Sequence, residues 1–449
     1  MKNPITILDH LQFDCPTSEQ KAALLGMSDF VKQENKDDFF ILCGAAGTGK
    51  TSITTALIGY LNTKSIAYNI AAPTGRAARI LGRKSKTVNS TIHSLIYNVQ
   101  ANPNTGQVNF VLKQNDVKDF NIFIIDEASM IASKAPQDKD SLFHSKNALL
   151  TDLIMFVKNG NQNNKIIFLG DNNQLPPINE KESLALSKEH LINHFNLKGD
   201  AKLLTEVKRQ DDGSYILKNA NTLREGITNN KKSIHYVGIK KQSVEDATRD
   251  YVLDYLANGE DSIISIGTTH NMNKMFNNNV RKKIYGRNAN IVENDDLLLV
   301  TQTWKRNGFT LYSGDHVRIK NIDLTTTEIV ANLRFAPIQL ISKNLKGEEE
   351  IIDDYILLDS VTNPTGLTAK QENHLRHERF KKNKVYRESL KPWDDRYVGA
   401  IRMTYGHSIT CNKAQGGEWD KVLVNSFFMP SLRFQYTAIT RARQNVSFY

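Results

Sequence analysis

Residues 44–51 of this chain read Gly-Ala-Ala-Gly-Thr-Gly-Lys-Thr, a spacing suited to holding a row of phosphates. Glycines at these positions let the backbone curl, so that its N–H groups point at phosphate oxygens. Lys50 would reach the β- and γ-phosphates, and the Thr51 hydroxyl would bind Mg²⁺. An apolar run at 39–43 precedes the loop, and a helix-compatible stretch at 50–61 follows it. This context indicates a nucleotide site rather than a chance glycine-rich turn.

Two further segments place polar side chains directly after apolar runs. Asp126 and Glu127 follow the run 121–125, where Asp126 would hold the Mg²⁺ shell and Glu127 would polarise an attacking water. Gln174, within 169–177, is placed to contact the γ-phosphate. Alone, an Asp-Glu pair usually marks a surface, and 169–177 is also typical of a turn before a Pro-Pro break. The phosphate loop in the same chain favours the catalytic interpretation.

The elements that must position these residues alternate along the chain. Short apolar, β-branched runs separated by helical stretches predict right-handed βαβ units in a parallel sheet, with strands at 39–43, 67–72, 121–125 and 165–169. A second such series begins near Leu203 and contains no phosphate loop, with strands at 262–267, 421–425 and 445–449. The sequence therefore predicts two α/β cores, of which one carries the nucleotide loop.

Two segments interrupt this pattern. Residues 95–113 hold two strand-like runs around the turn-rich 102–106, which predicts a hairpin. Residues 306–397 mix short strands with a charged, helical tract at 369–391. That tract is as typical of a solvated helix face as of a binding surface.

Composition narrows the class of protein. A chain of 449 residues is long enough for two or three cores, and no apolar run is long enough to span a membrane. Cys15, Cys43 and Cys411 lie too far apart to predict a metal site or a disulfide framework, so we expect a reducing, cytoplasmic setting. The net charge of +10 favours a polyanionic partner such as nucleic acid.

Together these segments resemble the superfamily 1 helicases, in the 5′-to-3′ branch of the RecD- and Dda-like enzymes. The matching segments occur in family order at 17–20, 72–78, 90–94, 125–130, 170–176, 205–210, 410–418 and 436–443. The region 306–397 matches only through 312–318, which looks like the start of the family's SH3-like barrel. One departure is Asn412, at a position where relatives often have histidine, because an amide can donate a hydrogen bond but cannot become cationic.

The resemblance implies an α/β fold of two RecA-like, P-loop NTPase-type domains with parallel sheets. It places domain 1A at 1–94 and 119–200, a hairpin insertion 1B at 95–118, domain 2A at 201–305 and 398–449, and an SH3-like insertion 2B at 306–397. The hairpin occupies the position of the family's strand-separating pin. In this arrangement arginines of the second core would neutralise charge on the transferring phosphoryl group, an effect on the order of 10³–10⁵ in rate.

The resemblance also implies the site residues. Catalytic roles fall to Lys50, Glu127, Gln174, Arg209 and Arg441, and Mg²⁺ to Thr51 and Asp126. Further nucleotide contacts fall to Gln20, as the adenine reader, and to Gly44, Ala45, Ala46, Gly47, Thr48, Gly49, Lys50, Thr51, Ser52, Gly416 and Glu418. The nucleic-acid contacts implied are Pro73, Thr74, Thr91, His93, Phe110, Thr269, Thr410 and Asn412.

The function implied is an ATP- and Mg²⁺-dependent DNA helicase that moves 5′ to 3′ on single-stranded DNA. We expect a monomer that meets duplex junctions and replication or recombination proteins in a bacterial or phage-infected cell. An RNA-directed helicase, a translocase without unwinding and an ATP-switched nucleic-acid-binding protein remain alternatives. A P-loop kinase or a GTPase is disfavoured, because residues 412–415 lack the acid of an Asn-Lys-x-Asp base reader and the sequence offers no other candidate.

Overall fold

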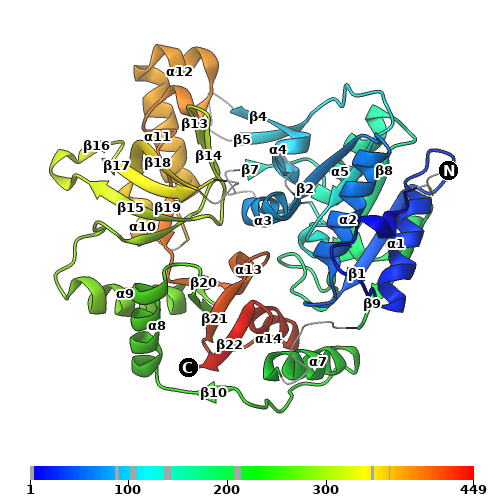
Figure 1. The fold of residues 1–449 in the computed structure, drawn as a ribbon. Helices are drawn as coiled ribbons and strands as arrows, with labels where there is room; N and C mark the ends of the chain where they lie inside the picture. The colour runs from blue at the N-terminus through cyan, green and yellow to red at the C-terminus, as the bar shows by residue number, and fades with distance from the viewer. Residues whose placement is uncertain are drawn as a thin grey trace. The chain divides into compact units, whose positions relative to one another are not determined.

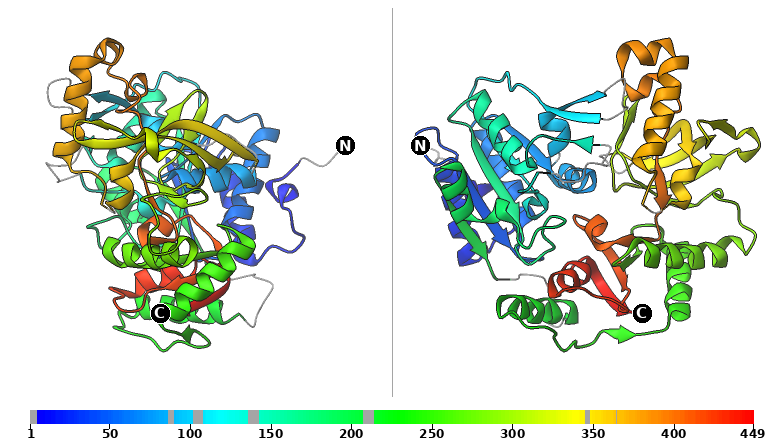
Figure 2. Two further views of the ribbon diagram at one scale, coloured as in Figure 1. Left: turned by 90° about the vertical axis from the view of Figure 1, so that its left-hand side faces the viewer. Right: turned by 180° about the vertical axis from the view of Figure 1, so that it is seen from behind.

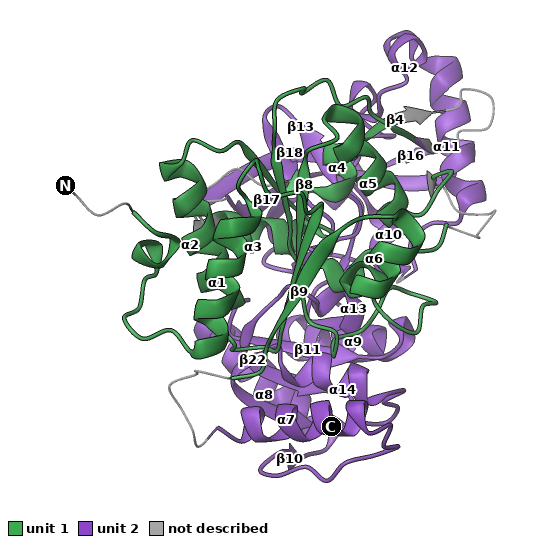
Figure 3. Ribbon diagram, turned by 90° about the vertical axis from the view of Figure 1, so that its right-hand side faces the viewer, with its two compact units in different colours: residues 1–98, 111–137, 145–213 green, residues 99–110, 138–144, 214–449 purple. Residues whose placement is uncertain are grey.

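The chain folds into two compact units, shown in Figure 3. The computed structural model describes residues 5–85, 90–101, 108–135, 143–206, 214–344, 348–363 and 365–449. The first unit comprises residues 1–98, 111–137 and 145–213, and the second comprises 99–110, 138–144 and 214–449. Within the described ranges, no helix combines the length and apolar character needed to cross a bilayer.

The first unit is built on a six-stranded sheet in the order β3-β2-β6-β8-β1-β9, with every pairing parallel. Its strands are β1 (Phe39–Gly44), β2 (Tyr68–Ala72), β3 (Ser90–Thr91), β6 (Ile122–Ile125), β8 (Lys165–Gly170) and β9 (Gly199–Leu204). The four strands predicted for the first core are all present. Every residue of β1, β6 and β8 is buried, as expected for a parallel sheet covered on both faces.

Helices cover both faces of this sheet, as the views in Figures 1 and 2 show. They are α1 (Ser18–Phe30), α2 (Lys50–Thr63), α3 (Gly75–Ser85), α4 (Ile92–Ile96), α5 (Leu149–Gly160) and α6 (Lys188–Phe195). Leu24 of α1 and Leu57 of α2 share one core with Ile124 of β6. On the opposite face, Phe123 packs edge-on against Phe156 of α5, with ring centroids 6.2 Å apart. This alternation follows from the period of two along a strand.

The strand β9 corrects one boundary taken from the sequence. The second series of strands was expected to begin near Leu203, within a domain starting at residue 201. Instead, β9 pairs in parallel with β1 along its whole length, from Phe39 opposite Gly199 to Gly44 opposite Leu204. The first sheet therefore extends through Leu204, because β1 would otherwise present an unpaired edge.

The second unit contains a five-stranded parallel sheet in the order β10-β22-β21-β11-β20. Its strands are β10 (Lys240–Lys241), β11 (Ile263–Gly267), β20 (Ser408–Thr410), β21 (Trp419–Val424) and β22 (Ala442–Phe448). The accompanying helices are α7 (Tyr215–Thr228), α8 (Val244–Asn258), α9 (His270–Tyr285), α13 (Cys411–Ala414) and α14 (Leu432–Ile439). The three strands predicted for the second core are present as β11, β21 and β22.

An antiparallel sheet is inserted into this unit, in the order β16-β17-β15-β12-β19, with β18 beside β17. Its strands are β12 (Leu297–Val300), β15 (His316–Ile322), β16 (Glu328–Val330), β17 (Leu333–Lys343), β18 (Glu349–Leu357) and β19 (Met403–Tyr405), and β13 (Trp304–Arg306) with β14 (Phe309–Leu311) forms a separate hairpin. The insertion therefore reaches beyond the expected range 306–397 at both ends, because β12 and β19 pair with each other.

The charged tract 369–391 forms two helices that lie along this sheet (Figures 1 and 2). They are α11 (Ala369–Lys382) and α12 (Lys384–Ser389), and the short helix α10 (Leu358–Thr362) precedes them. Arg379 donates to Asp395 at 2.8 Å, and the buried Glu372 accepts two hydrogen bonds of 2.8 Å from Arg402. Some charges of the tract are therefore structural, while others, such as Lys381, are exposed.

The predicted hairpin at 95–113 is present as two strands joined to a third. They are β4 (Tyr97–Ala101), β5 (Val108–Leu112) and β7 (Phe143–His144), in the order β4-β5-β7. The proposed turn at 102–106 lies outside the described residues. Short 3₁₀ helices complete the chain at η1 (Ile7–His10), η2 (Ala128–Met130), η3 (Leu184–Leu186), η4 (Leu324–Thr326) and η5 (Pro392–Asp394).

Candidate nucleotide and strand-binding sites

The phosphate loop connects β1 to α2, and its glycines have the backbone that the motif requires. Gly47 and Gly49 have φ angles of 83° and 87°, a region that side chains other than glycine rarely adopt. A Cβ added at Gly44 would lie 2.5 Å from the Thr48 hydroxyl oxygen. The curled loop therefore leaves a cradle that only glycines permit. Lys50 donates from Nζ to the carbonyl oxygens of Gly44 at 2.5 Å and Ala45 at 3.0 Å.

These contacts hold the Lys50 ammonium over the loop against neutral acceptors, so its charge is not cancelled by them. The remaining predicted loop residues, Ala46, Thr51 and Ser52, lie in the same turn and the first turn of α2. The start of α2 also presents backbone N–H groups, which favour anions. The residues present therefore fit a nucleotide triphosphate.

Gln20 lies beneath this loop and is 2% exposed. Its Oε1 accepts from the Thr17 backbone N–H at 2.9 Å, and its Nε2 donates to the Thr48 carbonyl at 3.0 Å. Thr17 in turn caps α1 by accepting from the Gln20 N–H at 3.1 Å. One amide thus fastens the start of α1 to the phosphate loop. The predicted contact of Gln20 with adenine stays a prediction.

Carboxylates and an amide follow the neighbouring strands at the same edge of the sheet. In the order β6-β8-β1, Asp126 and Glu127 follow β6, and Gln174 lies just beyond β8. Glu127 has a left-handed φ of 49°, and its N–H donates to Asp126 Oδ1 at 2.9 Å. Gln174 is 3% exposed, and its Oε1 has no hydrogen-bond partner among the described residues. A buried acceptor of this kind indicates a site completed by a ligand or water.

The oxygen donors at this edge suit a hard cation. Thr51 supplies a hydroxyl and Asp126 a carboxylate, which are the ligand types that Mg²⁺ takes beside phosphate oxygens and waters. Across the described ranges, no cluster of three or more His, Cys, Asp or Glu side chains forms a protein-only metal cage. Burial and the nearby Asp171 carboxylate raise the pKa of Cys43 to about 12, so this thiol stays protonated.

A pocket of about 260 Å³ in the first unit is lined by residues that were predicted to contact nucleic acid. Pro73 and Thr74, which follow β2, line it together with His93, which follows β3. Thr91 caps α4 by accepting from the Ser94 N–H at 3.1 Å and does not line this pocket. Burial lowers the pKa of His93, so the imidazole is neutral at pH 7 and can hydrogen-bond without charge.

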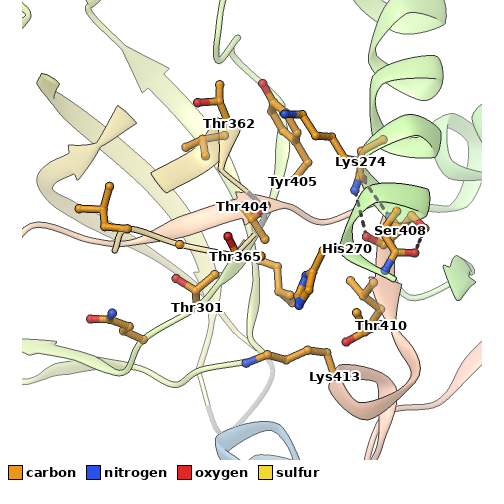
Figure 4. Close-up of a pocket in the computed structure, with 18 residues that line it drawn as sticks. His270, Lys274, Thr301, Thr362, Thr365, Thr404, Tyr405, Ser408, Thr410 and Lys413 are labelled. Atoms are coloured by element: carbon orange, nitrogen blue, oxygen red, sulfur yellow. Dashed lines mark hydrogen bonds between the residues drawn. The ribbon is translucent and has the colours of Figure 1, made fainter. Parts of the chain in front are cut away.

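A pocket of about 400 Å³ lies wholly within the second unit (Figure 4). The predicted Thr410 lines it, and Thr269 lies beside it as the cap of α9, accepting from the Met272 N–H at 3.2 Å. The polar residues that line it are His270, Asn273, Lys274, Asn277, Thr301, Gln302, Thr362, Thr365, Thr404, Tyr405, Ser408, Thr410 and Lys413. Within this described lining there is no carboxylate, so the pocket suits an anion.

Two of these side chains carry N–H donors suited to an anion. Asn273 is 5% exposed, and its Nδ2 has no acceptor among the described residues. Lys413 donates to the Ser313 hydroxyl at 3.0 Å, and burial lowers its pKa. Burial and the Lys413 charge also lower the pKa of His270. An anion in the pocket would raise the pKa of Lys413 and of His270 again, because a negative charge stabilises their cationic forms.

Arg441 joins the two other motifs of the second unit. It is 4% exposed and donates from Nε to Thr437 O at 3.1 Å and from Nη1 to Gly417 O at 3.3 Å. Gly416 and Glu418 flank that carbonyl, so three residues predicted for the nucleotide site lie together. Arg209 lies outside the described residues.

Comparison with known proteins shows which helicases this chain is similar to. Residues 18–239 match the family described as an AAA domain, and residues 405–449 match the UvrD-like helicase C-terminal domain. The chain is 27% identical over 339 residues to the ATP-dependent DNA helicase dda of Enterobacteria phage T4, covering 72% of this chain and 71% of that protein. It is 28% identical over 138 residues to the ATP-dependent RecD2 DNA helicase of Deinococcus radiodurans, covering 31% of this chain and 16% of that protein.

This chain is similar to the RecD- and Dda-like superfamily 1 helicases. The fold agrees with solved structures of Pif1 helicases. The Candida albicans structure has a TM-score of 0.51 and 15% identity, covering 97% of this chain and 94% of that chain. A Bacteroides structure in complex with ADP-AlF3 and ssDNA has a TM-score of 0.50 and 15% identity, covering 97% and 92%.

The structure does not bring together every residue that was predicted to contact nucleic acid. Phe110 lies on β5, in the second unit, and lines neither pocket. Asn412 lies on α13, two residues after Thr410, but it is not part of the pocket lining. His270 and Lys413 were missed, although Lys413 stands inside the matched segment 410–418 and its charge was the available signal.

Proposed function

We propose that this protein is an ATP-driven DNA helicase that moves 5′ to 3′ along single-stranded DNA and separates duplex strands. The observation that supports this most is the shared edge of the first sheet. The ends of β1, β8 and β6 carry the phosphate site, and the ends of the adjacent β2 and β3 carry the pocket of Pro73, Thr74 and His93. The proposed nucleotide site and the proposed nucleic-acid site would thus share one sheet.

A backbone hydrogen bond connects segments that lead to the two proposed sites. The Asp126 N–H donates to the Ala71 carbonyl at 2.9 Å, and Pro73 and Thr74 follow two and three residues after Ala71. A shift of the segment holding Asp126 and Glu127 would therefore be felt where the strand binds. Such coupling is what a motor needs, because ATP turnover must alter the grip on the strand.

The nucleotide chemistry follows from the residues at the sheet edge. Lys50 and the loop N–H groups would bind the phosphates, Glu127 would accept a proton from the attacking water, and Gln174 would orient that water or the γ-phosphate. Thr51 and Asp126 would hold Mg²⁺, which supplies charge neutralisation when bound. Arg441 and Arg209 are proposed to neutralise the charge of the transferring phosphoryl group.

The small hydroxyl groups in both pockets suit phosphates and sugars rather than base edges, which supports binding with little sequence preference. We propose a monomer that acts at single-stranded DNA and duplex junctions, in company with replication or recombination proteins. The relatives named above are DNA helicases, which favours DNA over RNA.

The test is ATP hydrolysis with and without a single-stranded oligonucleotide. The proposal expects turnover to rise strongly with DNA and to fall steeply with salt, with a log–log slope of affinity of roughly −0.7 per phosphate neutralised. Turnover that is unchanged by any strand would contradict a translocase. Stimulation by RNA alone would favour the RNA-directed alternative.

A further inference from the structure

Two adjacent phenylalanines of the second unit expose their apolar side chains to solvent. Phe427 is 88% exposed and Phe428 is 51% exposed, in the loop between β21 and α14. Each aromatic ring is in contact with water, although its burial would stabilise the fold. Adjacent exposed aromatic residues commonly mark a binding surface rather than a packing element.

Hydrogen bonds hold this loop against the segment that contains Thr269, a residue predicted to contact nucleic acid. The Thr268 hydroxyl donates to the Phe428 carbonyl at 2.5 Å, and the Asn425 N–H donates to the Ile266 carbonyl at 2.9 Å. The residue after Thr268 is Thr269, the cap of α9. The two rings therefore project from a loop held beside Thr269 by two hydrogen bonds.

Sheet topology places this loop in line with the anion-suited pocket of the second unit. Strands β21, β11 and β20 are consecutive and parallel, so their carboxyl ends share one edge. The phenylalanine loop follows β21, Thr269 and His270 follow β11, and Thr410 ends β20. Neighbouring strands are about 4.8 Å apart, so this row spans roughly 10 Å, a distance that a few nucleotides can bridge.

Along this edge of the sheet, from β20 to β21, the side chains change from anion-binding to aromatic. At the β20 end, Lys413, Lys274 and the unpaired Nδ2 of Asn273 line the pocket. At the β21 end are the exposed rings of Phe427 and Phe428. A single strand presents both matching groups, phosphates along its backbone and flat bases beside them.

We propose that Phe427 and Phe428 form a stacking platform for bases of the single strand whose backbone the pocket holds. This inference rests on the proposed function and adds an element that no motif carries. Stacking on an aromatic side chain tolerates any base, since each base has a π-face. The platform would therefore strengthen grip without adding sequence preference.

The test compares two labelled oligonucleotides of equal length, one of thymidines and one of abasic sites, by fluorescence anisotropy. The double variant Phe427→Ala/Phe428→Ala should bind the thymidine strand about fivefold or more weakly, and the abasic strand as wild type does. Phe427→Trp should keep wild-type affinity, and its added emission should be quenched by the thymidine strand. Leu253→Ala/Leu256→Ala is the matched control, because these α8 leucines are each 64% exposed in the same unit, and it should bind like wild type.

Unchanged thymidine affinity in the double variant would overturn the platform, as would equal weakening for both strands. Stimulation of wild-type ATP hydrolysis by the same oligonucleotide separates the two proposals. If the wild type is stimulated but the phenylalanine variants behave like it, only the platform fails. If the wild type neither binds nor responds to the strand, the proposed function fails first and the platform with it.

Discussion

Substitution of Gln20 by glutamate would separate two roles that the sequence alone cannot distinguish. Gln20→Glu keeps the acceptor that binds the Thr17 N–H but replaces the donor that holds the Thr48 carbonyl. The lost bond is 3.0 Å long and buried, and a carboxylate oxygen would then face a carbonyl oxygen. Leaving buried polar groups unsatisfied costs about 1–3 kcal/mol.

If that cost appears as distortion of the phosphate loop, the KM for nucleotide should rise by about 5- to 100-fold. The loop holds phosphates, so the rise should be the same for ATP and GTP. Thr17→Ala is the control, because it removes the helix cap, worth about 1 kcal/mol, and leaves the bond from Gln20 to Thr48 in place.

The assay is steady-state hydrolysis of ATP and of GTP at saturating single-stranded DNA, for wild type and both variants. We expect a raised KM for both nucleotides in Gln20→Glu and a near-normal KM in Thr17→Ala. A rise confined to ATP would refute the reasoning and show that Gln20 acts by reading adenine. Equal KM values in the two variants would show that the loop does not depend on this bond.

Three other substitutions have defined outcomes. Lys50→Ala should lower turnover by about a hundredfold or more while leaving strand binding intact, checked by hydrolysis beside anisotropy. Arg441→Ala should lower kcat by about 10³ with a modest loss of nucleotide affinity, whereas an unchanged rate would remove its proposed role. Burial lowers the pKa of His407 to about 3. The unfolded state therefore binds more protons below about pH 6.5, the free energy of unfolding should fall from there toward pH 3, and His407→Gln should flatten that slope in urea titrations.

The phosphate loop and the buried strands could be predicted because their signals are local. The segment 44–51 dictates its own backbone, and apolar runs such as 121–125 form buried strands in the structure. The β9 strand could not be placed this way. Whether Gly199–Leu204 joins the first or second sheet depends on an edge left open by β1, which sequence spacing does not reveal.

The lining of the pocket in the second unit could not be predicted from the sequence for a similar reason. Thr301 and Thr404 are about a hundred residues apart and belong to no matched segment. They line one pocket because β12 and β19 pair, with Leu299 opposite Thr404. Long-range strand pairing of this kind is set by the whole sheet, so motif reading found Thr410 and missed its neighbours across the pocket.

Directional movement along single-stranded DNA is the core of the proposed function. Unwinding of two otherwise identical duplexes, one with a 5′ single-stranded tail and one with a 3′ tail, tests it most directly in the presence of ATP. Strand separation is expected from the 5′-tailed duplex, with Lys50→Ala inactive on both. Separation of the 3′-tailed duplex instead, or of neither despite DNA-stimulated hydrolysis, would contradict it.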